Sequence, residues 1–572
     1  MLIKPFMKSN IVVLLLYLLT ISSCSPEKEQ QMATLIIHGG TIYTVEDERP
    51  TAEAVAIREN KILLTGSFEE VLALKDTDTE VIDLEGKMMT PGFIEGHGHL
   101  MGLGYNELEL DLSSTTSYQE IIDKVEVAVK ALNPGEWIVG RGWHQSKWSD
   151  LPATMVKGFQ THEALSAVSP DNPVFLSHAS GHAGFANAKA MEMAGVSSRS
   201  EGVEGGEIMT YPDGRPTGIF NEKAQSIIGS IIPEDSPERI QLAFESAIKA
   251  CQRNGITSFH DAGISGGIIE LYKQMKSEGK LQVRIHAMLS SRDSLLLEDW
   301  FLKGPELDED NLLNIRSIKI HSDGALGSRG AWLLEEYSDM AGHFGHSTMP
   351  LPSVEYIVNQ SIEKGFQVCT HAIGDRANKE ILDRYQLGFE IYPNKSENHR
   401  FRIEHAQHLN SDDIPRFAEL GVIPAMQGIH MSSDRPWAID RIGEQRIKEG
   451  AYMWQALLKS GVPIVNGTDV PVESINPINC FYASVSRKTL KGTPEGGYEP
   501  EQKMTREQAL RSYTQDAAFG SFDEDIKGSI TKGKLADFTI FDQDIMTVPE
   551  ADILKTKVAM TIFDGKVVFT AP

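Results

Sequence analysis

The stretch Thr90–Leu100, TPGFIEGHGHL, is the part of the chain that decides its fold. After a Thr-Pro-Gly turn, a short apolar run leads to His97 and His99, with Gly96 and Gly98 beside them. On an extended strand, residues i and i+2 project from the same face, so both imidazoles point the same way. The glycines leave room for another group to approach the backbone. Two adjacent neutral imidazoles suit a divalent metal ion, although this spacing also occurs in loops and on surfaces. The stretch therefore predicts a strand that ends at a candidate metal site.

Further along the chain, strand-like runs alternate with helical patterns. Several of these runs end in a polar or titratable residue followed by Gly or Asp. The runs are GITSFHDAG (255–263), VRIHAML (283–289), SIKIHSDG (317–324), FQVCTHAIGD (366–375), FRIEHAQ (401–407), VIPAMQ (422–427) and PIVNGTD (463–469). Alternating β and α elements with polar groups at the C-terminal strand ends are typical of a TIM-type (β/α)8 barrel, an α/β fold in which those ends surround one pocket. We therefore predict a barrel within residues 90–522.

The segments that flank the predicted barrel are β-rich. Residues 33–89 and 523–572 alternate apolar and polar residues and contain turn pairs. We predict that they form one composite β-sandwich beside the barrel, although two unrelated hairpin clusters would give the same pattern. Residues 108–225 are long for one barrel connection and contain three tryptophans and Pro/Gly-rich turns. We interpret this segment as an insertion over the barrel mouth.

The first 24 residues have the features of an export signal. Lys4 and Lys8 precede the apolar run Ile11–Leu19, and small residues lead to Cys24. This order resembles the signal peptide of bacterial lipoproteins, in which the cysteine is lipidated and begins the mature chain. A plain signal peptide or an uncleaved anchor is the alternative. Residues 25–32 are polar and indicate a tether. We therefore expect an exported bacterial lipoprotein, anchored to a membrane by its lipid and facing the periplasm or held in the outer membrane.

Composition bounds the partners of the chain. Its 572 residues carry a formal net charge of −26, from 80 acidic and 54 basic residues. Nucleic-acid binding needs a basic surface, so we expect a small-molecule substrate and no nucleic-acid partner. Cys24, Cys251, Cys369 and Cys480 are spaced too widely for a disulfide framework or a Cys-x-x-Cys metal site. The sequence leaves the oligomeric state open, an oligomer included.

Four residues at predicted strand ends add candidate ligands, namely Lys319, His371, His405 and Asp469. Each has an ordinary explanation when taken alone, because a strand Lys usually pairs with a carboxylate, a core His is usually hydrogen-bonded and an Asp often caps a helix. The C-terminal ends of barrel strands surround one pocket, so these side chains and the histidine pair should converge there. His321 would share the face of Lys319, as a ligand, as a substrate contact or turned away by a bulge.

Motifs throughout the chain after residue 24 resemble the amidohydrolase superfamily, and in particular amidohydrolase family 3, the branch that includes N-substituted formamide deformylases. The motifs are PGFIEGHGHL (91–100), HAGFANAKAM (182–191), GRPTGIFNEKA (214–224), GITSFHDAG (255–263), IKIHSDGALGSRGA (318–331), THAIGDRA (370–377), RIEHAQ (402–407), GTDVPV (467–472) and GSITKGKLADFTIFD (528–542). Their number and order are specific for the family and far less specific for a substrate. The resemblance implies a metal-dependent hydrolase of C–N bonds other than peptide bonds.

The resemblance also implies how the metal is held. His97 and His99 would bind one divalent ion, and His371 and His405 would bind a second. Lys319 matches a lysine that CO2 carboxylates in many relatives, which turns an ammonium into a two-oxygen ligand that bridges both ions. These ligands suit zinc and also accept iron or manganese. We expect two ions, while the position of His321 keeps a single ion as the alternative.

Asp469 matches the family's catalytic aspartate and is also a candidate metal ligand. A water activated by the metal would lose a proton to Asp469, which would then protonate the leaving nitrogen. We predict hydrolysis of an amide, a formamide or another N-acyl small molecule. The same site would serve an ester, a lactone or a cyclic ureide. A non-catalytic, ligand-binding surface lipoprotein is the third reading, against which the presence of a general base argues.

Candidate substrate contacts come from several regions, and each has a structural alternative. They are His182 and Asn187 in the insertion, His321 on its strand, and Gln427, His430 and Arg435 after the run VIPAMQ. Arg435 is a candidate for binding an anionic group. Trp143 and His144 are candidates for a lid against an apolar N-substituent. The alternatives are a hydrogen-bonded turn at Asn187 and ordinary packing of Trp143.

Overall fold

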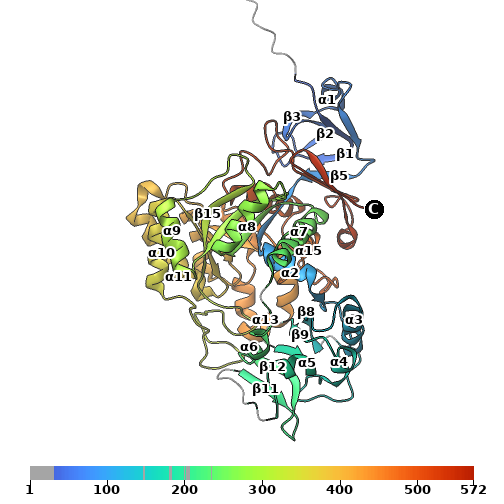
Figure 1. Cartoon of the computed structure of the whole chain (residues 1–572). Coiled ribbons are helices and arrows are strands. Elements are labelled where there is room, and N and C mark those ends of the chain that lie inside the picture. The colour runs from blue at the N-terminus through green and yellow to red at the C-terminus, as the bar shows by residue number, and fades with distance from the viewer. Residues whose placement is uncertain (1–30, 146–147, 180–182, 199, 201–205, 234) are drawn as a thin grey trace, which may run out of the picture.

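A parallel barrel forms the centre of the computed structural model, which describes residues 31–572 except 146–147, 180–182, 199, 201–205 and 234 (Figure 1). The strands, in the order in which neighbours are hydrogen-bonded, are β19 (Val465–Asn466), β18 (Ile423–Met426), β17 (Arg402–His405), β16 (Gln367–Ala372), β15 (Leu313–His321), β14 (Arg284–Ser290), β13 (Ile256–Ile264) and β6 (Phe93–Gly98). All seven pairings in this sheet are parallel. Each run expected to be a barrel strand overlaps one of these strands. The predicted (β/α)8 fold is therefore confirmed.

Backbone hydrogen bonds bring the first and last barrel strands together. The amide of Asp469, just after β19, donates to the carbonyl of His97 at 2.8 Å, and the amide of His99 donates to Val470 at 2.8 Å. A Cβ on Gly96 would overlap the carbonyl oxygen of Asn466. The glycine beside the histidine pair therefore permits the close approach of β19 and its following loop. As a result, Asp469 lies directly beside His97 and His99.

Helices follow the strands and cover the barrel from outside (Figure 1). They are α2 (Leu100–Leu108), α7 (Pro237–Arg253), α8 (Gly266–Ser277), α9 (Ser294–Lys303), α10 (Leu351–Lys364), α11 (Asp375–Ile391), α12 (Ile414–Leu420), α13 (Gly428–Gly450), α14 (Trp454–Ser460), α15 (Pro477–Ser486), α16 (Arg506–Ser512) and α17 (Gln515–Phe519). Residue choice at their ends explains where several begin. Ser236 caps α7 by accepting from the Arg239 amide, and Pro237 occupies the first helical position, where no amide partner is lost. The helices bury their apolar faces in one large core shared with the barrel strands.

Strands from both terminal segments pair in a second sheet. Its strands are β22 (Lys566–Thr570), β21 (Val558–Phe563), β20 (Phe538–Phe541), β5 (Met88–Pro91), β1 (Leu35–Tyr43), β2 (Thr51–Arg58) and β3 (Lys61–Gly66), with β4 (Glu80–Asp83) beside β1 and α1 (Phe68–Leu72) packed nearby. The antiparallel pairing of β20 with β5 joins the two termini. Arg284, at the start of β14, connects this sheet to the barrel through an ion pair with Asp537 at 2.7 Å. Both side chains are buried.

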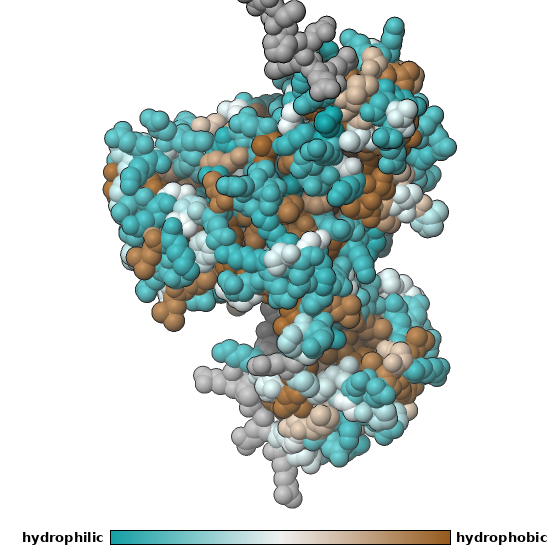
Figure 2. Space-filling view, turned by 45° about the horizontal axis from the view of Figure 1, so that its top comes forward, coloured by the Kyte–Doolittle hydropathy of each residue, from teal (hydrophilic) through white to brown (hydrophobic). Residues whose placement is uncertain are grey.

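The insertion forms a separate lobe, seen at the bottom of Figures 1 and 2. It contains a six-stranded sheet in the order β11 (Gly206–Thr210), β12 (Pro216–Glu222), β10 (Ala183–Ala186), β9 (Val174–His178), β8 (Ile138–Trp143) and β7 (Leu110–Asp111), with helices α3 (Tyr118–Ala131), α4 (Glu163–Val168), α5 (Ala188–Met193) and α6 (Gln225–Gly229). Short 3-10 turns complete the chain at Pro393–Lys395, Ser411–Asp413, Pro500–Gln502 and Glu550–Lys555. The lobe has its own apolar clusters, so it packs as a unit.

Several predictions concern residues outside the described part of the chain. The signal peptide, Cys24 and most of the tether lie there. Cys251, Cys369 and Cys480 are buried free thiols. Among the described residues, we find no helix with the length and apolarity needed to cross a membrane.

Candidate metal centre

A cavity of about 610 Å³ lies at the C-terminal ends of the barrel strands. We call it the site cavity. Side chains from β6, β15, β16, β17, α13 and the loop after β19 line it. The wall includes all six predicted ligands, namely His97, His99, Lys319, His371, His405 and Asp469. The described part of the insertion contributes none of the lining residues. Residues that lie far apart in the sequence therefore meet as the barrel prediction required.

The first two histidines are each fixed through Nδ1. His97 Nδ1 pairs with the carboxylate of Glu404, and His99 Nδ1 lies 2.9 Å from the carbonyl of Ala262. The Nε2 atoms of both rings face Asp469, whose Oδ1 lies 3.6 Å from that of His97 and 3.2 Å from that of His99. A partner on one ring nitrogen selects the tautomer and leaves the other nitrogen available to a metal.

His405, on the other side of Asp469, is also fixed through its Nδ1 atom. Its Nδ1 lies 2.6 Å from the Gln427 side-chain oxygen. Nitrogens of His405 and His430 and an oxygen of Asp469 lie within 4.8 Å of one another. Both His405 and Asp469 have positive φ, 74° and 57°. Such strained backbone is frequent at functional sites, and here it occurs at two of the strand ends that supply ligands.

Lys319 occupies the interior of the barrel wall between these groups. Its Nζ lies 3.0 Å from His97 Nε2, and its side chain is almost fully buried. Burial lowers its pKa, although Glu404 and Asp469 act in the opposite direction. A lowered pKa favours the neutral amine, which is the form that reacts with CO2.

The electrostatics of Asp469 differ from those of a typical buried carboxylate. Burial raises its pKa, but the hydrogen bond with His99 and the charge of His97 outweigh burial, so the pKa lies well below its usual value. Asp469 is therefore a carboxylate at neutral pH.

His371 and His321 are stacked on neighbouring strands, with ring centroids 5.6 Å apart. His371 Nε2 is buried without a hydrogen-bond partner and lies 3.5 Å from Asp323. Asp323 is occupied by the amides of Trp332, Ile373 and Gly374. His321 Nδ1 is likewise buried without a partner. His321 lines the site cavity together with Lys319, so no bulge turns it away from the face of Lys319.

The donor set fits a divalent metal. Two clusters of ligand atoms, His97/His99/Asp469 and His405/His430/Asp469, each lie within 4.8 Å and share the aspartate. Imidazole and carboxylate are suitable ligands for zinc, and they are also common for iron and manganese. The Nε2 atom of His430, a buried member of the second cluster, has no hydrogen-bond partner, which is a further sign that a bound group completes the site.

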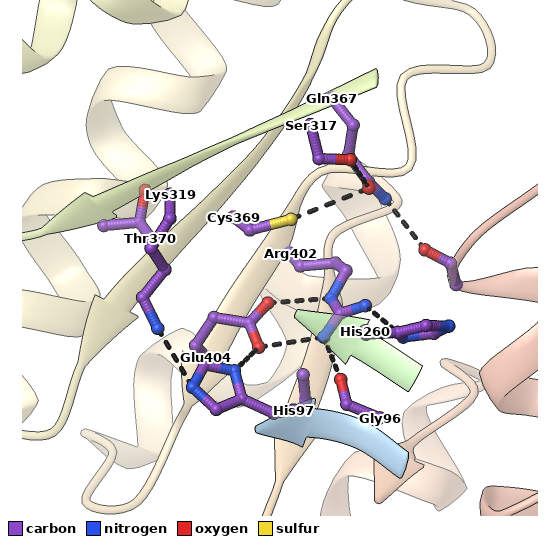
Figure 3. A network of polar contacts seen from close by, with 12 residues as sticks. Gly96, His97, His260, Ser317, Lys319, Gln367, Cys369, Thr370, Arg402 and Glu404 are labelled. Atoms are coloured by element: carbon purple, nitrogen blue, oxygen red, sulfur yellow. Dashed lines mark hydrogen bonds and ion pairs between the residues drawn. The ribbon is translucent and has the colours of Figure 1, made fainter. Parts of the chain in front are cut away.

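A buried ion pair supports the first cluster through His97 (Figure 3). Arg402 and Glu404 are adjacent on one face of β17 and are fully buried. Arg402 donates to Glu404 at 2.7 and 2.8 Å, to the Gly96 carbonyl at 2.7 Å and to His260 at 2.9 Å. The neighbouring Arg402 and His97 outweigh the effect of burial and lower the pKa of Glu404. We did not predict this pair, although Arg402 and Glu404 lie in RIEHAQ at the i, i+2 spacing that signals one face of a strand.

Glu95 supports the Asp469 loop. It is fully buried, accepts the Thr468 amide at 2.6 Å and accepts the Thr468 hydroxyl at 3.0 Å. Burial raises its pKa to about 8. Glu95 thus connects β6 to the loop that carries the catalytic candidate.

Two predicted substrate contacts have structural partners instead. Asn187 is fully buried in the insertion, caps α5 and makes five hydrogen bonds to its surroundings. This is the structural turn that the sequence left as an alternative. Arg435 binds Glu499 at 2.7 Å and does not line the site cavity. Its charge is already compensated, which argues against an anion contact.

The other predicted substrate contacts either line the site cavity, support a residue that lines it, or lie in the insertion. His321 and His430 line the site cavity, while Gln427 acts behind it by holding His405. Trp143 is fully buried in the insertion core and donates to the Leu176 carbonyl at 2.8 Å, as in the packing alternative. His144 contacts the ring of His178 in the same lobe, and His182 lies outside the described residues.

One wall of the site cavity was predicted only in part, through His430. His430, Asp434, Trp437 and Arg441 all lie on α13 and all line the cavity. Their spacing of four, three and four residues places them on one helical face. The spacing is visible in the sequence, but nothing in it shows which face of a helix meets a pocket.

Comparisons with known proteins identify relatives of this chain in sequence and in structure. The amidohydrolase family profile matches residues 80–569. The putative amidohydrolase YtcJ of Bacillus subtilis is 31% identical, covering 93% of this chain and 99% of that protein. The N-substituted formamide deformylase of Arthrobacter pascens is 26% identical, covering 94% and 98%. The crystal structure of an uncharacterized metal-dependent hydrolase from Pyrococcus horikoshii is 27% identical with a TM-score of 0.73, covering 90% and 99%.

Proposed function

The chain belongs to the amidohydrolase family, and from this premise we propose that it hydrolyses the C–N bond of an amide, a formamide or another N-acyl small molecule at a divalent metal centre. The observation that carries the proposal is the position of Asp469 between two clusters of histidine nitrogens. The similarity to an N-substituted formamide deformylase supports a C–N bond as the target.

The residues divide into those that would hold the metal and those that move protons. His97, His99, His371 and His405 supply imidazole nitrogens, and Lys319 would supply a bridging carbamate after its neutral amine adds to CO2 and loses a proton. A divalent ion, which we expect to be zinc, supplies the charge that lowers the pKa of water and polarises the substrate carbonyl.

Asp469 would carry the proton through the reaction. Its lowered pKa keeps it ionised, so one carboxylate oxygen can accept the proton of the attacking water. The same oxygen would then donate that proton to the leaving nitrogen, which departs as a neutral amine. Glu95 and the backbone bond to His97 hold the Asp469 loop in place, which limits the motion of the carboxylate.

The experiment that tests this role is the substitution Asp469→Asn. We expect metal content to stay near that of the unaltered protein, while kcat falls about 10²–10⁴-fold, as for loss of a general acid–base group. Asp412→Asn is the matched control, because Asp412 is exposed and does not line the site cavity. Turnover of N-substituted formamides and of matched esters would be measured side by side. Near-normal amide turnover by Asp469→Asn would refute the assignment, and turnover of the esters alone would assign the site to ester hydrolysis.

A further inference from the structure

Helix α13 is the wall of the site cavity that leads away from the metal ligands. His430 lies nearest to them, with its ring centroid 6.0 Å from that of His405. Asp434 follows one helical turn later, about 6 Å along the axis. Trp437 and Arg441 continue the same face. A substrate whose carbonyl sits at the metal ligands would therefore extend along these side chains.

Asp434 is a carboxylate without a cationic partner. No Lys, Arg or His nitrogen of the described chain lies within ion-pair distance of it, and its contacts are two long hydrogen bonds of 3.4 Å, from Gln407 and Ser433. Burial raises its pKa to about 6; the nearby His430 acts against burial, and Glu473 acts in the same direction as burial. A cation that enters the cavity would stabilise the charged form of the Asp434 carboxylate.

Glu473 lines the same cavity from the loop after β19. It too has no ion-pair partner within the described residues. Two carboxylates therefore face one space without a counter-charge. Arg441 does not supply this counter-charge, because its guanidinium is paired with Asp339. Asp339 also binds Arg329 at 2.8 Å.

Two further features of this wall point to a ligand. His430 is 92% buried, by its relative exposure of 8%, and its Nε2 has no partner. A buried nitrogen in this state is normally satisfied by a bound group. Trp437 contributes an aromatic surface to the same wall, with the guanidinium of Arg441 5.9 Å from its ring centroid, and such a surface favours an apolar body.

We propose that Asp434 and Glu473 bind a protonated amino group of the substrate, about one helical turn from the scissile C–N bond, with Trp437 packing against an apolar part of the same substrate. The substrate class is then an amine compound acylated on one nitrogen and positively charged at another. The reaction is the one proposed above, and this inference rests on it for the position of the scissile bond. Recognition of the cation is a separate property of the α13 wall.

The kinetic test compares two formamides of the same shape, N-[4-(aminomethyl)benzyl]formamide and N-(4-ethylbenzyl)formamide. We expect Asp434→Asn to lower kcat/KM for the charged compound at least about tenfold, mainly through KM, because a hydrogen bond to a charged group is lost. For the neutral compound, kcat/KM should stay nearly unchanged. Glu473→Gln should act in the same direction, and Asp412→Asn should have no effect. Equal losses for both compounds would overturn the proposal.

A binding test separates this inference from the hydrolytic function. Benzyltrimethylammonium carries a positive charge but no free electron pair, so it cannot bind a metal. Its affinity for the metal-loaded protein would be measured by calorimetry, with benzyl alcohol as the neutral probe. We expect Asp434→Asn to weaken binding of the cation about tenfold, because the attraction between opposite charges is lost, and to leave the alcohol unaffected. If the cation binds in this way but no formamide is hydrolysed, the proposed function fails and the cation site stands. If neither variant changes cation binding, the cation site is refuted whatever the enzyme hydrolyses.

Discussion

Replacing Glu404 by Gln tests whether the buried ion pair beneath the metal ligands acts on the metal or on the fold. Glu404 accepts from His97 Nδ1 and pairs with Arg402 at 2.7 Å, and all three side chains are at most 1% exposed. A neutral amide would leave Arg402 as an uncompensated buried charge, which costs about 3–5 kcal/mol of stability. It would also replace the carboxylate that fixes the His97 tautomer. Changes to such supporting partners typically lower metal affinity about 10–100-fold, or about 1.4–2.7 kcal/mol at 1.36 kcal/mol per tenfold step.

The two effects are separable because they have different assays. Urea unfolding of the metal-free protein gives the stability term, and competition with a chromophoric chelator gives zinc affinity. The double variant Arg402→Met/Glu404→Gln removes both charges, so we expect it to recover most of the stability and none of the zinc affinity. The reasoning would be refuted if Glu404→Gln lost stability as calculated yet bound zinc as tightly as the unaltered protein. In that case Glu404 would serve the fold alone.

Three further substitutions test other parts of the structure. Lys319→Ala should lower the metal content, measured by elemental analysis after purification with bicarbonate, from near two ions per chain to about one; an unchanged content would remove Lys319 from the ligand set. Arg284→Leu should reduce the unfolding free energy by about 3–5 kcal/mol in urea, because Asp537 is left buried without its partner; a change under about 1 kcal/mol would mean that the pair does not join barrel and terminal sheet. Asn187→Ala should lower the same free energy by about 2 kcal/mol or more, through the lost cap and hydrogen bonds, with KM unchanged; a raised KM at full stability would instead support a substrate contact.

The barrel and the convergence of the candidate ligands on one cavity were predictable because both depend on local patterns. The period of two in β6 places His97 and His99 on one face, and parallel strands put their C-terminal ends together. No knowledge of pairing partners is needed for either step. Asp469 follows from the same rule, since it comes directly after the last barrel strand.

The roles that required a distant partner were not predictable in the same way. Arg435 reads as a free cation until Glu499, 64 residues later in the chain, is found to neutralise it. From the sequence, Asn187 fits a substrate contact as well as a helix cap, and only its five hydrogen bonds decide between them. Gly96 was expected to make room for an unspecified group, and that group is the backbone of β19. In each case the deciding information is tertiary contact, which composition and periodicity do not contain.

The histidines of the centre differ in how firmly the protein fixes their rings. His97, His99 and His405 each have Nδ1 held by a protein group, so their Nε2 atoms are set before anything binds. In His371 and His430, by contrast, the Nε2 atoms are buried and have no hydrogen-bond partner. The protein already orients the first three rings, so a bound metal does not have to do so. The Nε2 atoms of the other two rings become hydrogen-bonded or coordinated only when a metal or a substrate binds. The cluster beside β6 is therefore preorganised for a metal, and the side facing α13, where His430 and Asp434 lie one turn apart, is the part of the cavity whose polar groups a substrate can complete.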